Sequence, residues 1–209
     1  HGAFRQHDQV IASHLGIVSI NGRLIKIIPL RGKYTPKRGD TVIGRIVDMS
    51  FSNWYVDIGC ANDAVLSIRE VNEYVEQGAD LAQYYNFGDL IAAKINKVSR
   101  STVDITMKSM GLRKLGRGKV IKVDPSKVPR VIGKQGSMIS LIKEKTNCKI
   151  LVGQNGLIWL QGTVDEEFVA TDVIELINKE SHKEGLTDKI SAYLDSLNKK
   201  KPAPKVTKQ

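Results

Sequence analysis

The sequence predicts a chain of several small domains, mainly β in its first half and mixed α and β in its second. Alternating apolar and polar residues form five short strand candidates within roughly 70 residues, which is typical of a small closed barrel. Further along, a G-x-x-G turn at residues 133–136 joins an apolar lead to a helix. With 209 residues, 41% of them hydrophobic, the chain can bury more than one core.

A β-hairpin is expected at the start of the chain. Segments Ile17–Ile20 and Leu24–Ile28 flank Asn21-Gly22, a dipeptide that favours a two-residue hairpin turn, and Pro29 is expected to stop the second strand. Both faces of this hairpin are apolar, and a lone hairpin is not stable in water, so it should pack against another surface. Residues 1–6 lack an initiator Met and look like a tag remnant or an internal start, so they are left out of the fold prediction.

The barrel strands are expected between residues 37 and 110. Gly39-Asp40 and Gly88-Asp89 each open an alternating strand, and three further candidates complete the set: Trp54–Ile58, Ala64–Ile68 and Val103–Met107. The string N-W-Y-V-D-I-G, followed by D-A-V-L-S-I, resembles the S1 domain, an RNA-binding barrel of the OB-fold type.

The S1 resemblance implies a binding role for one aromatic residue of the second strand. Tyr55 would stack on bases, although a partly buried barrel aromatic fits the pattern equally well. Trp54 is expected to pack against a neighbouring domain or subunit. Two inter-strand loops rim the binding face in such barrels. The candidate contacts near these loops are Phe51, Lys97 and Arg100.

The most informative string covers residues 131–150. The turn Gly133-Lys134-Gln135-Gly136 opens a helix with Ile139 and Ile142 on its apolar face, ending near Thr146. Two glycines three apart let another backbone approach, and the free N–H groups at a helix start favour a phosphate. The string resembles the KH domain, which holds about four nucleotides of single-stranded nucleic acid. The resemblance implies clamping by the turn with Arg130 nearby, and an apolar floor for bases formed by Ile132, Ile139 and Ile150.

The surrounding pattern fits a KH domain of the type I-like order β-α-α-β-β-α. The expected flanking elements are a strand at Lys119–Val123, a hairpin of 150–152 and 157–160 across Asn155-Gly156, and a helix at Asp165–Asn178. A second helix follows, with a stripe of Leu186, Ile190, Tyr193, Leu194 and Leu197 after the cap candidate Thr187. From Lys199 on, a Lys-rich disordered tail is expected.

The charge is concentrated where the G-x-x-G turn lies. The chain has 32 Lys and Arg against 22 Asp and Glu, a net charge of +10, which fits a polyanionic partner such as nucleic acid. Residues 111–149 hold 11 basic and 2 acidic residues, whereas residues 150–178 hold 5 acidic and no basic residues. Charge and motif therefore point independently to the same part of the chain.

These observations divide the chain into four parts: an N-terminal β unit at 1–36, an OB-fold S1 barrel at 37–110, a KH domain at 111–180, and a C-terminal helix with a tail at 181–209. This order resembles the RNA-binding cap subunit of the exosome, of the archaeal S1–KH type. Three strings support the resemblance: Tyr34-Thr35-Pro36 before Gly39–Gly44, Trp54 with Val56–Ile58, and Gly153-Gln154-Asn155-Gly156.

The family resemblance implies a non-catalytic role. Such a subunit binds single-stranded RNA, docks through its N-terminal unit on a hexameric ring of phosphorolytic exonuclease subunits, and is present in three copies per ring. The residues agree, because no nucleophile–base arrangement or two-metal pattern occurs, and four scattered histidines have no metal-ligand spacing. No cofactor is expected. Cys60 and Cys148 are expected to be buried thiols in a reducing compartment.

Two other functions remain open from the sequence. A free-standing transcription regulator of the NusA type also places S1 before KH, but that family has two KH units in tandem. A nuclease of the polynucleotide phosphorylase type has both modules in the reverse order, behind a large catalytic core. No apolar run approaches a membrane span, so the sequence predicts a soluble, cytoplasmic protein with no membrane partner.

Overall fold

The computed structural model describes residues 3–13, 15–22, 24–29, 32–76, 78–181 and 185–200. The chain forms two compact units, and each unit is built from three segments that are separate in the sequence. The first unit runs to Gly116 and also takes in 122–128 and 152–158, and the second holds 117–121, 129–151 and the chain from Trp159 on. The predicted domains are continuous stretches of sequence, whereas each of these units combines segments that are separate in the sequence.

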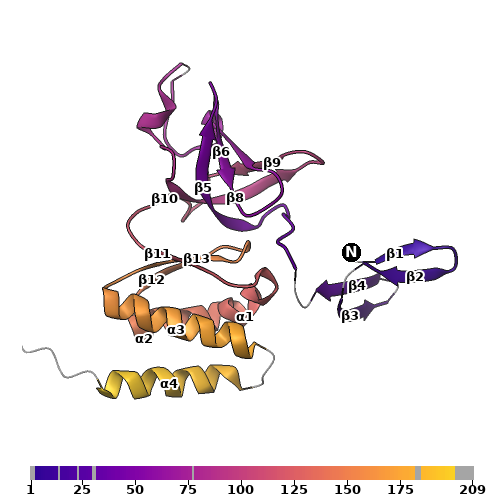
Figure 1. Ribbon diagram of the computed structural model, residues 1–209, viewed down its shortest axis with the longest axis vertical. Helices are drawn as coiled ribbons and strands as arrows, with labels where there is room; N and C mark the ends of the chain where they lie inside the picture. The colour runs from indigo at the N-terminus through magenta and orange to yellow at the C-terminus, as the bar shows by residue number, and fades with distance from the viewer. Residues whose placement is uncertain are drawn as a thin grey trace, which may run out of the picture. The chain divides into compact units, whose positions relative to one another are not determined.

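Two antiparallel hairpins begin the first unit (Figure 1). Strand β1 (Ala3–Gln6) pairs with β2 (Gln9–Ala12), and β3 (Gly16–Asn21) pairs with β4 (Leu24–Pro29). The predicted hairpin is therefore confirmed. Leaving out the first six residues was wrong for Ala3–Gln6, because these residues form a strand in register with the next one.

A closed barrel of five strands follows, as predicted. Its strands are β5 (Thr41–Met49), β6 (Asn53–Asp57), β7 (Ala64–Ser67), β8 (Leu90–Val98) and β9 (Val103–Thr106). The sheet order is β10-β8-β5-β6-β7-β9, and a further pairing of β8 with β9 closes the barrel. Three short elements were not predicted: η1 (Ile68–Glu70), η2 (Leu81–Gln83) and β10 (Lys114–Leu115).

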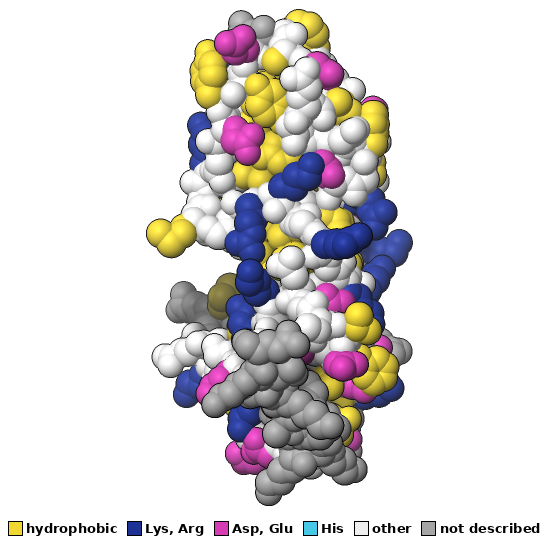
Figure 2. Space-filling view, turned by 90° about the vertical axis from the view of Figure 1, so that its left-hand side faces the viewer, with side chains coloured by type: hydrophobic (Ala, Val, Ile, Leu, Met, Phe, Trp, Pro, Cys, Tyr) yellow, Lys and Arg dark blue, Asp and Glu magenta, His cyan; other side chains and the backbone are white. Residues whose placement is uncertain are grey.

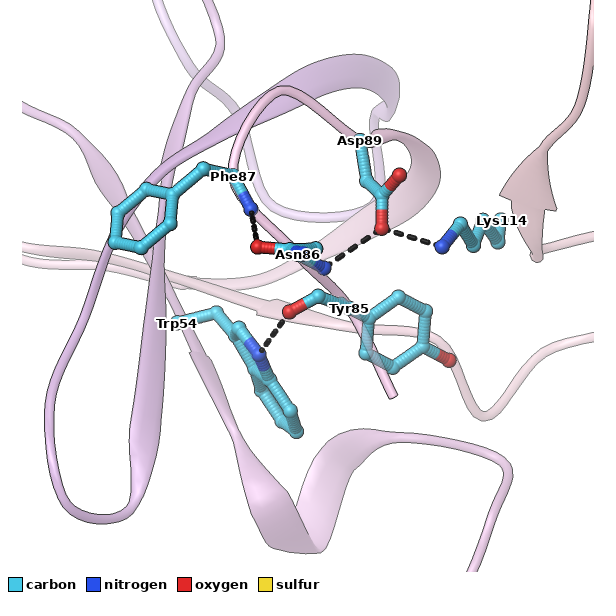
Figure 3. Close-up of polar contacts among 6 residues, drawn as sticks. All are labelled: Trp54, Tyr85, Asn86, Phe87, Asp89 and Lys114. Atoms are coloured by element: carbon cyan, nitrogen blue, oxygen red, sulfur yellow. Dashed lines mark hydrogen bonds and ion pairs between the residues drawn. The ribbon is translucent and has the colours of Figure 1, made fainter. Parts of the chain in front are cut away.

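Trp54 lies in the core of the barrel and not against a neighbouring domain or subunit, so that prediction was wrong. Its side chain is 0% exposed. The indole Nε1 donates a hydrogen bond to the carbonyl oxygen of Tyr85 at 3.1 Å, and the two rings meet edge to face (Figure 3). Because side chains alternate along a strand, Trp54 points to the same side as Val56, which is also buried.

The turn between two strands of the KH fold packs in the first unit. Gly156 N–H donates to the carbonyl of Gly153, and Gly153 N–H donates to Leu157, which closes the turn. The amide of Asn155 is buried and hydrogen-bonded to three backbone groups of the barrel, two on Ile43 and one on Ile58. The predicted hairpin turn is thus present, and its asparagine anchors it to the barrel.

The KH fold has the predicted element order, with a sheet of order β11-β13-β12. Its elements are β11 (Lys119–Lys122), η3 (Pro125–Lys127), α1 (Val128–Ile132), η4 (Lys134–Gly136), α2 (Ser137–Thr146), β12 (Lys149–Val152), β13 (Leu157–Gln161) and α3 (Val164–Glu180). On α2, Met138 is buried beside Ile142, whereas Ile139 is only half-buried. The expected apolar face is therefore rotated by one residue.

The C-terminal helix α4 (Leu186–Lys200) packs against α2 and α3 through Leu186, Ile190 and Leu194, which are buried. Lys145 at the end of α2 donates a hydrogen bond to Asp195 on α4 at 2.5 Å. This hydrogen bond raises the pKa of Lys145. Thr187 lies within the helix, so its prediction as the cap was wrong. The expected tail overlaps the end of α4, and residues 201–209 lie outside the described residues.

Candidate nucleic-acid interface

The G-x-x-G segment forms a tight left-handed turn. Gln135 (φ 54°, ψ 26°) and Gly136 (φ 81°, ψ 9°) occupy its two central positions. The N–H of Ser137 donates to the carbonyl of Lys134, which completes a type I′ turn. The turn therefore leads directly into the first residue of α2.

The two glycines of the turn have different roles. Gly133 has φ 76° and ψ 173°, a conformation that is essentially restricted to glycine, and a Cβ there would lie 2.7 Å from the backbone nitrogen of Met138. A Cβ on Gly136 would meet nothing closer than a methyl of Ile139 at 3.9 Å. Gly133 is therefore required by the fold, whereas the space above Gly136 is open to a bound group.

The start of α2 is electrostatically positive. No side chain caps it, and its first turn holds no acidic residue. Helix α3 is the opposite case, since Thr163 and Glu166 form a capping box and three acidic residues occupy its first turn. The partial positive charge of a helix start is thus neutralised on α3 and remains available to an anion on α2.

The predicted clamp residues lie together in the second unit. Arg130, Lys134 and Gln135 are exposed, which places two cations beside the turn. The predicted floor is uneven, because Ile132 and Ile139 are half-exposed while Ile150 on β12 is only 6% exposed. Two of the three isoleucines therefore present surface to a ligand, whereas Ile150 belongs to the buried core.

The predicted barrel contacts belong to the first unit. Tyr55 lies half-exposed on β6, while Lys97 and Arg100 are exposed near the β8–β9 loop. That loop is closed by Ser99 N–H donating to Thr102, and Phe51 projects from the β5–β6 loop.

The strand register reveals neighbours of Tyr55 that sequence reasoning missed. Tyr55 lies opposite Asp48 on β5 and opposite Val65 on β7, and Val65 in turn lies opposite Asp104 on β9. Asp104 is also paired in register with Lys97. Tyr55 thus has one carboxylate, that of Asp48, directly beside it, whereas Asp104 lies one strand further away and opposite Lys97. Only the pairing of distant strands brings these residues together, and no local sequence signal could have found them.

No group of three or more His, Cys, Asp or Glu side chains that could hold a metal ion occurs in the described part of the chain. Cys148 is buried as expected, whereas Cys60 is only half-buried. Partial burial, with a smaller effect from the charge of Asp57, raises the pKa of the Cys60 thiol above its ordinary value. Among the described residues, no helix is long and apolar enough to span a membrane.

Comparison with known proteins matches two family models to this chain. The model described as "RRP4, S1 domain" matches residues 33–97, and the KH domain model matches residues 118–176. A crystal structure of an exosome complex RNA-binding protein superposes with a TM-score of 0.70 at 34% identity, covering 80% of this chain and 98% of that one.

Curated relatives are archaeal proteins named exosome complex component Rrp4. The Pyrococcus abyssi protein is 44% identical over 199 residues, covering 92% of this chain and 75% of the relative. The Methanobrevibacter smithii protein is 41% identical, and the chain spans 64% of its length. The Methanothermus fervidus protein is 41% identical over 195 residues, with 92% of this chain and 86% of the relative covered. The chain belongs to the Rrp4 family of exosome complex components.

Proposed function

We propose that this chain is a non-catalytic RNA-binding subunit of an exosome. It captures single-stranded RNA and feeds it to a 3′→5′ exonuclease ring. The observation that carries the proposal is the uncapped, acid-free start of α2 behind the Gly133–Gly136 turn, with Lys134 and Arg130 exposed beside it. The RNA phosphates bind at this helix start.

The apolar N-terminal hairpin supports docking on other subunits. Neighbouring residues Ile17 and Val18 point to opposite faces of β3, and both are well exposed, as is Ile20 at 70%. Exposed apolar surface of this kind marks an interaction site. We propose that it docks on a hexameric ring of phosphorolytic subunits, with three copies of this chain on one ring, in the cytoplasm.

The clamp is tested by two isosteric substitutions at Gly136. Asn and Asp both tolerate the left-handed conformation, and neither meets a close neighbour at this position. Gly136→Asp places a carboxylate in the phosphate site and should weaken binding of a labelled single-stranded RNA by about tenfold or more. Gly136→Asn, the uncharged control, should stay within about threefold of the parent chain. Equal affinity of both variants would move the phosphate site elsewhere.

The assembly is tested by native mass spectrometry of the tagged chain purified from its own cells. A complex with three copies of this chain on a six-membered ring is expected. A monomer, or a complex with RNA polymerase, would overturn the docking proposal and favour the free regulator.

A further inference from the structure

We propose that the chain contains a second contact for the RNA backbone, on the segment that leads from β10 to β11. This inference rests on the proposed RNA-binding function. The segment is Arg113-Lys114-Leu115-Gly116-Arg117-Gly118-Lys119, with four cations and no acidic residue in seven positions. No part of the KH clamp or of the barrel face described above includes it.

The segment is held firmly at its first end. The carbonyl of Arg113 accepts a hydrogen bond from Ala92 N–H at 2.9 Å, and Lys114–Leu115 pairs with β8. Leu112 and Leu115 are buried and anchor the backbone in the first unit. Arg113 therefore projects from a fixed backbone, which reduces the conformational entropy that binding would cost.

The other end is held in the second unit. A Cβ at Gly118 would meet the carbonyl oxygen of Leu160 and lie 2.5 Å from the Nε1 atom of Trp159. Gly118 is thus the residue that lets the chain pass against β13. Lys119 follows as the first residue of β11.

The cations of this segment are exposed to solvent. Of the four cations of the segment, only Lys114 has an ion pair with a described residue, Asp89, at the turn beyond Tyr85 (Figure 3). Arg113, Arg117 and Lys119 are exposed, and no ion pair involving them occurs in the part of the chain that the structure describes. Figure 2 shows that Lys and Arg side chains reach the surface among side chains of other types on the face that it presents.

The spacing of these cations suits a single strand of RNA. Arg113 and Lys119 are six residues apart, so their Cα atoms lie at most about 20 Å from each other. This limit follows from the covalent chain and not from the placement of one unit against the other. Exposed cations spaced along such a segment bind successive phosphates without reading bases. The segment therefore extends the RNA contact beyond the nucleotides that the clamp holds.

The test compares two triple variants of equal net charge. R113Q/R117Q/K119Q removes the three unpaired cations of the segment, and K33Q/K108Q/K179Q removes three exposed lysines elsewhere, so each lowers the net charge of +10 by three. Binding of a twelve-nucleotide single-stranded RNA is measured at several salt concentrations, with circular dichroism as the check on folding. The segment variant should bind about tenfold more weakly, with a salt slope less steep by about 2, since each phosphate contact contributes about 0.7. The control triple should retain most of the affinity.

Two further measurements separate this inference from the clamp. A four-nucleotide RNA fills the clamp alone, so the segment variant should bind it as the parent chain does, while Gly136→Asp should weaken both lengths. The charge-conserving variant R113K/R117K/K119R should restore binding of the long RNA. If the two triple variants bind the long RNA equally, the second contact does not exist, even if Gly136→Asp confirms the clamp. Loss of binding in the segment variant with no effect of Gly136→Asp would instead overturn the clamp.

Discussion

The side-chain amide of Asn155 pairs with both backbone groups of Ile43, a residue 112 positions earlier in the chain. Nδ2 donates to the Ile43 carbonyl at 2.7 Å, and Oδ1 accepts from the Ile43 N–H at 3.3 Å. Nδ2 also donates to Ile58 at 2.9 Å. One buried side chain thus replaces strand-like pairing for three backbone groups of the barrel.

Replacing this amide should destabilise the first unit strongly. Asn155→Ala leaves three buried backbone groups without a partner, and the free energy of unfolding should fall by about 2–4 kcal/mol. Asn155→Asp should be at least as harmful, because a carboxylate would face the two carbonyl oxygens. Urea denaturation provides the measurement. Gln154→Ala is the control, since only the backbone N–H of Gln154 bonds to Thr41, and a loss as large as that of Asn155→Ala would contradict the role given to the Asn155 amide.

The two glycines of the turn should respond differently to alanine. Gly133→Ala should lower the stability of the second unit by about 3 kcal/mol or more, because the methyl would overlap the backbone of Met138 in a conformation restricted to glycine. Gly136→Ala should cost only about 1 kcal/mol, the penalty of a left-handed residue with open space around it. Thermal unfolding measures the loss of stability in each variant, and the loss should be larger for Gly133→Ala. Similar losses would show that the turn relaxes around either side chain.

Trp54 should be a stability residue and not a docking residue. Trp54→Phe removes the hydrogen bond to the Tyr85 carbonyl and leaves a small cavity, so the free energy of unfolding should fall by about 2 kcal/mol. Binding of RNA and of partner subunits should not change at temperatures where the variant is folded. Weakened assembly in a fully folded variant would restore the earlier interpretation of Trp54 as an interface residue.

Ionisation of the Tyr34 hydroxyl should lower the free energy of unfolding at high pH. Burial, reinforced by the hydrogen bond that its hydroxyl donates to Asp40 at 2.7 Å, raises the pKa of Tyr34 above its ordinary value of 10. Because the folded pKa is the higher one, this stabilisation is complete below pH 10 and is lost as the pH rises through the interval between the unfolded and folded values.

The variant Tyr34→Phe isolates this effect. Urea unfolding at about pH 8 and about pH 11 should show a larger stability difference between the parent chain and Tyr34→Phe at the lower pH. The many lysines titrate in both proteins and cancel in the comparison. A difference that stays constant with pH would mean that the hydroxyl ionises equally easily in the folded and unfolded chains.

Local patterns in the sequence predicted most of the fold because they reflect local physics. The alternation of apolar and polar residues predicted the barrel strands, and Asn21-Gly22 predicted the first hairpin. The spacing of two glycines predicted the turn before α2. Predictions about individual side chains were less successful where a neighbour came from elsewhere in the chain. Trp54 lies two residues before the core residue Val56 on the same strand, a spacing that also places it in the core. Its hydrogen-bond partner Tyr85, however, lies 31 residues away, on the turn after η2.

The sequence by itself determined the order of domains, the position of the G-x-x-G turn and the basic block around it, since turn residues, periodicity and charge are local properties. The tertiary structure alone decided that Gly133 is structural while Gly136 is open, because that depends on the distance to Met138. It also decided that Asp48 and Val65 flank Tyr55, because strand register places residues together regardless of their separation along the chain.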